Sequence, residues 1–228
     1  MFNLKDPTHR RGFLGSLAAG AAAIGMSGLA APLKGVAAPA SAPMPGPEGS
    51  FDSWIGKIKG KHRQVYDAPA LNAGMAFAWS RVFYMTNKQV GVPESDVSVV
   101  VVLRHDAIPL ALANPAWEQY KLGEFFHIED AKTKGPAVRN PYYMPAAGEL
   151  LLPDMSIEEL TKTGVLFGAC DMALTVYSKF MGEGMGLDPE KIKADWVSNL
   201  LPGMQVVPSG VLAINRAQEA GCSYCFAG

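Results

Sequence analysis

The chain has 228 residues, enough for one sizeable domain with a buried core. Hydrophobic residues make up 49% and charged residues 18%, a composition typical of globular proteins and unlike that of disordered tails. The formal net charge is −1 and the sequence has no basic run, so the composition gives no indication of nucleic-acid binding.

Residues 1–40 have the pattern of an export signal. Arg10 and Arg11 form a twin-arginine pair, and a weakly hydrophobic stretch rich in Gly and Ala follows them. This segment resembles a twin-arginine (Tat) signal, and we predict cleavage after Ala40. The alternatives are a short membrane helix or an uncleaved anchor, and the high Gly and Ala content argues against the helix. Export predicts a periplasmic or equivalent location, with membrane contact only during export.

The segment after the signal predicts a linker and then one domain. Residues 41–50 (SAPMPGPEGS) are rich in Pro, Gly and Ser, so the folded domain is expected to span residues 51–228. The signal carries a net charge of +3, which leaves −4 on the rest of the chain.

Apolar runs of strand length alternate with helical stretches in this domain, a pattern that favours parallel β-α-β units. The run VSVVVVLRH is β-branched at most positions and is expected to be covered by helices on both faces. We predict strands at residues 63–68, 97–105, 165–169, 203–208 and 222–228, and helices at 72–89, 115–122, 157–163, 171–182, 189–200 and 209–220.

The middle of the domain, residues 107–153, is less regular. Its Pro-rich part, 135–148, has too many prolines for a helix interior. A long excursion of this kind is usually a functional loop or a lid, and less often an insertion without a role.

The last third of the chain combines three features. A glycine-led apolar strand ends in Cys170 (GVLFGAC), the motif LLPGMQVVPSGVLAINRAQEAG follows, and an aromatic strand closes the chain. Over residues 157–228 this pattern resembles the DsrE/DsrF-like family of sulfur-handling proteins. The resemblance implies a three-layer, flavodoxin-like α/β fold with a mostly parallel five-stranded sheet and helices on both faces. It also implies a homo-oligomer, a persulfide on Cys170 in place of any cofactor, and a small sulfur species or a sulfur-carrier protein as partner.

Cys170 stands where a predicted strand gives way to a predicted helix. In an open parallel sheet, reactive groups lie at the carboxyl ends of the strands, and the N–H groups of a helix N-terminus stabilise a thiolate. The neighbouring Asp171 argues against this reading, because a carboxylate repels a thiolate. The alternative is that Cys170 is a small buried hydrophobic residue.

His105 and Asp106 end the strongest predicted strand, at the same edge of the sheet as Cys170. His105 is a candidate general base or metal ligand, or else a hydrogen-bonded structural group. Arg104 is a candidate anion contact. We therefore expect Cys170 and His105 to be catalytic, and Arg104, Asp106 and Asp171 to be binding residues.

Cys222 and Cys225 form a C-x-x-C, which indicates a redox pair or half of a zinc site. On a strand, however, their α-carbons lie about 10 Å apart on opposite faces, beyond the span of about 7 Å that a disulfide allows. Structural thiols are the favoured interpretation, and a disulfide in a turn or a metal half-site are the alternatives. We predict no metal site.

Three functions remain open. The leading hypothesis is an exported protein that binds or relays sulfane sulfur through Cys170, with His105 assisting. The alternatives are a non-catalytic oligomeric module that binds a small ligand, and a periplasmic carrier of metal or haem. The sequence has no G-x-G-x-x-G, P-loop or G-x-S-x-G motif, so nucleotide and hydrolase functions have no support.

Overall fold

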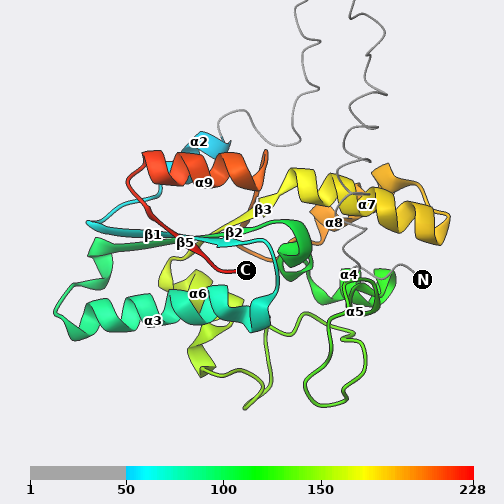
Figure 1. Cartoon of the computed structure of the whole chain (residues 1–228), viewed down its shortest axis with the longest axis horizontal. Coiled ribbons are helices and arrows are strands. Elements are labelled where there is room, and N and C mark those ends of the chain that lie inside the picture. The colour runs from blue at the N-terminus through cyan, green and yellow to red at the C-terminus, as the bar shows by residue number, and fades with distance from the viewer. Residues whose placement is uncertain (1–49) are drawn as a thin grey trace, which may run out of the picture. The chain divides into compact units, whose positions relative to one another are not determined.

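The computed structural model describes residues 50–228, in which strands and helices alternate (Figure 1). The twin-arginine pair, the cleavage position after Ala40 and the linker up to residue 49 lie outside the described residues. The strands are β1 (His62–Ala68), β2 (Val97–Leu103), β3 (Leu166–Cys170), β4 (Met204–Val207) and β5 (Ser223–Phe226). The α-helices are α2 (Ser50–Ile55), α3 (Met75–Gln89), α4 (Asn114–Tyr120), α5 (Leu122–Phe125), α6 (Ile157–Thr163), α7 (Asp171–Met185), α8 (Pro189–Ser198) and α9 (Gly210–Glu219).

All five strands run parallel, in the order β4-β3-β2-β1-β5. The predicted three-layer, flavodoxin-like α/β class with a five-stranded sheet is confirmed. From β1 to β4 the chain moves across the sheet in one direction, and it then crosses back through α9 to place β5 beside β1. Because such crossovers are right-handed, reversal of direction puts α9 on the opposite face from α3. Figure 1 shows α2 and α9 on one side of the sheet and α3 and α6 on the other.

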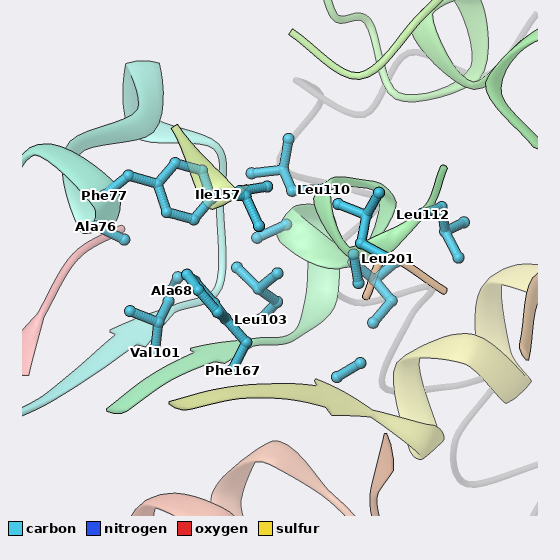
Figure 2. Packing of buried hydrophobic residues seen from close by; sticks show 14 of the residues in the cluster. Ala68, Ala76, Phe77, Val101, Leu103, Leu110, Leu112, Ile157, Phe167 and Leu201 are labelled. Atoms are coloured by element: carbon cyan, nitrogen blue, oxygen red, sulfur yellow. The ribbon is translucent and has the colours of Figure 1, made fainter. Parts of the chain in front are cut away.

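The central strand β2 is buried on both faces, as its β-branched run predicted. Val99 and Val101 belong to the larger core, which α3 and α6 cover, while Val100 and Val102 belong to a smaller core beneath α2 and α9. Figure 2 shows the larger core, where side chains from α3, β2, β3 and α6 meet. Those labelled there include Phe77, Val101, Leu103, Ile157 and Phe167.

Several element boundaries differ from the prediction because of backbone turns. The strand predicted to reach His105 ends at Leu103, since His105 takes a φ of 50° and begins the 3-10 helix η3 (His105–Ala111). The helix predicted at residues 115–122 is two helices, α4 and α5, separated by Lys121 with a φ of 49°. The helix α2 was not predicted.

Buried polar groups connect parts of the irregular middle segment to one another. Asn140 is fully buried, and its amide nitrogen donates to the carbonyls of Leu110 (2.8 Å) and Leu112 (3.0 Å). Glu149 forms ion pairs with Arg139 at 2.6 Å and Lys132 at 2.9 Å. These contacts fix the Pro-rich segment without regular secondary structure.

Candidate functional site

The sulfur of Cys170 lies between the N-terminal ends of two helices. Cys170 ends β3 and is the N-cap of α7, where its Sγ accepts a hydrogen bond from the backbone N–H of Ala173 at 3.4 Å. A second donor comes from the other side, because the N–H of Gly210, the first residue of α9, points to the same Sγ at 3.1 Å. The predicted position of Cys170 at the strand-to-helix turn is thus correct.

This environment combines burial with polar donors. Cys170 is only 5% exposed, so little of the residue is open to a reagent. The first N–H groups of a helix carry partial positive charge and favour negative charge on a neighbouring atom. Two such helix ends directed at one sulfur suit a thiolate or the anion of a persulfide.

Arg104, directly after β2, is held by a buried carboxylate. Its Nε and one terminal nitrogen, Nη2, donate to the two oxygens of Asp67 at 2.7 and 2.9 Å, and Asp67 also accepts from the hydroxyl of Tyr224 at 2.9 Å. Asp67 is 3% exposed. The hydrogen bond to Asp67 raises the pKa of Arg104 despite the opposing effect of burial, and Tyr224 and Cys170 add smaller coulombic contributions in the same direction.

Gly210 contacts both Cys170 and Arg104. A Cβ on Gly210 would lie 2.7 Å from Cδ and 2.8 Å from Cβ of Arg104, closer than carbon atoms approach in proteins. The missing side chain therefore lets Arg104 lie across the start of α9, beside the N–H that binds Cys170. The structure brings together two of the predicted site residues, Cys170 and Arg104.

His105 and Asp106 form a second group, against α7. The imidazole Nδ1 of His105 lies 3.1 Å from Oδ1 of Asp106 and 3.4 Å from the hydroxyl of Tyr177, which donates a short hydrogen bond to the same carboxylate oxygen. The rings of Phe125, Phe126 and Phe180 surround Tyr177.

The protonation of this second group follows from its surroundings. Burial, and then the hydrogen bond to Asp106, raise the pKa of Tyr177, so its hydroxyl remains a donor. Burial would raise the pKa of Asp106 as well, but the hydrogen bonds with His105 and Tyr177 outweigh it and lower that pKa. Asp106 is therefore an anion that orients His105.

Asp171, predicted as a binding residue, is paired within the fold. Its carboxylate oxygens lie 2.8 and 2.9 Å from Nζ of Lys193 on α8, and the residue is 7% exposed. The ammonium group of Lys193 offsets the repulsion that the neighbouring carboxylate would exert on negative charge at Cys170.

Cys222 and Cys225 are free thiols and lie in different cores. Cys222 is buried beneath α9, whereas Cys225 packs against the larger core on the opposite face of the sheet. Burial raises the pKa of Cys222 to about 11, and burial also raises the pKa of Cys225. The structure does not bring the two thiols together.

A cavity of about 300 Å³ lies in the middle segment. Its lining includes the apolar Leu71, which follows β1, and the charged Arg139 and Glu149. The remaining lining residues are His127, Ile128, Glu129, Asp130, Ala131, Pro141, Tyr142 and Leu150. Cys170 does not line it.

Within residues 50–228, no group of three or more His, Cys, Asp or Glu side chains is arranged to hold a metal ion. None of the described helices is long and apolar enough to cross a membrane. Comparisons with protein-family models and with curated proteins found no match to the chain.

The sequence analysis missed several residues that shape both groups. Asp67 had one available signal, since it is a carboxylate that follows Val65 and Tyr66 at the carboxyl end of a predicted strand. Tyr177 follows Cys170 by seven positions on the same helix, which places both on one side of α7. Tyr224, Gly210 and Lys193 gave no signal, because their partners are far away in the sequence.

Proposed function

We propose that this protein accepts sulfane sulfur on the thiol of Cys170 and holds it as a persulfide for transfer. The observation that carries the proposal is the pair of backbone donors, from Ala173 on α7 and Gly210 on α9, directed at the Sγ of Cys170. These donors favour negative charge on the sulfur that attacks and on the persulfide that results.

The proposed step is a sulfur transfer between thiols. The thiolate of Cys170 attacks the outer sulfur of a donor persulfide, R–S–SH, and a new S–S bond forms at Cys170. The S–S bond of the donor breaks, and its electron pair leaves with the thiolate R–S⁻. The product is Cys170–S–SH, so the step consumes no oxidant or reductant, and the reverse reaction with an acceptor thiolate releases the sulfur.

His105 is the proposed assisting group. Its ring is held by Asp106 and Tyr177, and an imidazole oriented by a carboxylate is an effective proton acceptor and donor. In this role His105 accepts the proton that the Cys170 thiol loses before attack and gives it to the departing thiolate R–S⁻.

The proposed setting is an exported, DsrE-like homo-oligomer. Export rests on the Tat-like signal with Arg10 and Arg11, and the family rests on the motif around Cys170 and residues 200–221. The partner is a small sulfur species or a sulfur-carrier protein, and the persulfide takes the place of a separate cofactor.

A small-ligand-binding module is the second candidate. It is favoured by the cavity of about 300 Å³, which is lined by both apolar and charged side chains. In that case a ligand binds in the middle segment and Cys170 has no part in its affinity.

The experiment that tests the first candidate is intact-mass spectrometry of the reduced protein after exposure to glutathione persulfide. We expect wild type to gain one sulfur atom that reductant removes, and Cys170→Ser to gain none at that position. Cys225→Ser is the matched control, because it removes a more accessible thiol and should leave loading at Cys170 intact. Equal loading of wild type and Cys170→Ser, assigned by peptide mapping to other thiols, contradicts the proposal.

A further inference from the structure

Arg104 carries one nitrogen that the fold does not use. Nε and Nη2 donate to Asp67, while Nη1 has no hydrogen-bond acceptor within residues 50–228. A guanidinium group has five N–H donors and cannot lose its charge, so the remaining donors keep their capacity to bind an anion. The Arg104 side chain is 27% exposed, which leaves part of it open to an incoming molecule.

The buried partners of Arg104 fix the direction of its guanidinium edge that carries Nη1, the free edge. The Asp67 side chain is 4% exposed, whereas that of Arg104 is 27% exposed, so the ion pair has its cation on the outer side. The hydroxyl of Tyr224 supplies a third hydrogen bond to the same carboxylate. A bidentate pair of this kind restricts rotation of the guanidinium plane.

The free edge also has a fixed relation to the reactive sulfur. The methylene groups of Arg104 pass over Gly210, whose N–H binds Sγ of Cys170 at 3.1 Å. A donor whose sulfur approaches Cys170 at the start of α9 therefore meets Arg104 next to it.

We propose that Arg104 is the specificity residue of this site, which selects sulfur donors bearing an anionic oxygen group, and that Asp67 and Tyr224 are its positioning residues. The inference rests on the proposed loading of Cys170. It adds the substrate class, which is persulfides of thiols that carry a carboxylate, and thiosulfonates. In both, negatively charged oxygen atoms lie close to the sulfur that is transferred.

The test compares two donors of similar size that differ in charge: the persulfide of 3-mercaptopropionate and the persulfide of 2-mercaptoethanol. The initial rate of sulfur loading at Cys170 is measured against donor concentration for the full chain. We expect wild type to prefer the carboxylate donor, and Arg104→Gln to raise the KM for that donor about tenfold, as loss of a charge-assisted hydrogen bond implies. Its KM for the neutral donor and its kcat with either donor should remain within about twofold, since neither depends on that bond.

Three further variants separate positioning from folding. Tyr224→Phe removes one hydroxyl from a half-exposed ring, so it should fold normally and raise the KM for the anionic donor by a smaller factor. Arg104→Lys should recover part of the preference, because it restores charge without the planar fork. Arg216→Gln, an exposed arginine on α9 that pairs with Glu219, is the control and should change neither KM.

The outcomes distinguish this inference from the proposed function. If wild type accepts sulfur from neither donor at Cys170, the proposed function fails, and the assignment of Arg104 fails with it. If wild type loads from both donors and Arg104→Gln leaves the ratio of the two KM values unchanged, the specificity role alone is overturned.

Discussion

The backbone N–H of Gly210 lies 3.1 Å from the sulfur of Cys170, although forty residues separate them in the chain. Strand order accounts for this contact, since β3 and β4 are neighbours and both carboxyl ends open at the same edge. The helix that follows β4 therefore starts beside the cysteine that ends β3. The contact is a product of topology and not of local sequence.

Gly210→Ala should disturb this site and lower stability. An added Cβ would meet the Cβ and Cδ of Arg104 at 2.8 and 2.7 Å, so either α9 or Arg104 must move. We expect a loss of about 1–3 kcal/mol, typical of overpacking, together with slower sulfur loading at Cys170. Urea denaturation and the intact-mass assay measure the two effects.

The matched control is Gly184→Ala, on the exposed side of α7. Nothing lies within 4 Å of a Cβ at that position, so alanine should stabilise the helix by about 0.5–1 kcal/mol. If both substitutions changed stability in the same direction, the close approach of Arg104 to Gly210 would not matter energetically.

Local patterns were sufficient to predict the five strands, most of the helices and the edge of the sheet that carries the site. The β-branched run in β2 indicated a strand buried on both faces. The helix predicted at residues 157–163 is α6, and the hydroxyl of its N-cap, Ser156, accepts from the N–H of Glu159. Because reactive groups lie at the carboxyl ends of the strands in a parallel sheet, the sequence predicted that Cys170 and Arg104 lie at one edge.

The partners of these residues could not be predicted in the same way. Asp67 and Tyr224 are 157 positions apart, and they meet because β5 returns to pair with β1. His105 leaves the strand because its backbone takes a φ of 50°, a conformation that no glycine marks in the sequence. Long-range pairing and left-handed turns of this kind leave little trace in a single sequence.

Lys193→Met should destabilise the fold through Asp171. The carboxylate of Asp171 is nearly buried, and the substitution removes its ammonium partner at 2.8 Å while keeping the length of the side chain. A buried charge without its partner costs about 3 kcal/mol or more, reduced here because the N-terminus of α7 also favours an anion. Equilibrium unfolding at neutral pH measures the change.

An exposed pair on α6 provides the comparison. Lys162 and Glu159 form an ion pair whose side chains are 68% and 45% exposed, so Lys162→Met should cost less than about 1 kcal/mol. Equal losses for the two lysine variants would mean that Asp171 does not depend on Lys193.

Tyr177→Phe should lower stability in a pH-dependent way. The hydrogen bond from Tyr177 helps to hold the pKa of Asp106 below its ordinary value of 3.8, so its contribution is present above about pH 4 and is lost as the pH falls below that value. We expect a cost of about 1 kcal/mol at pH 7, modest because Asp106 is half-exposed, and a smaller cost at pH 3. Chemical denaturation at both pH values measures the difference.

Tyr66→Phe removes a hydroxyl whose acceptor does not titrate. Tyr66 donates to the backbone carbonyl of Trp79 at 3.1 Å, so the cost of its loss should be the same at pH 3 and pH 7. A cost of Tyr177→Phe that is equally independent of pH would contradict the role assigned to Asp106.

Cys225 should react with iodoacetamide well before Cys222 in the folded protein. Cys222 is 6% exposed and its pKa is raised to about 11, so at pH 8 roughly one such thiol in a thousand is ionised. Cys225 packs against the larger core but is partly exposed, and burial raises its pKa as well. Peptide mapping after timed labelling should show at least a tenfold difference in rate, and the difference should disappear in urea, where both thiols are solvated. A Cys222–Cys225 disulfide in the native protein would contradict the placement of these two side chains on opposite faces of the sheet.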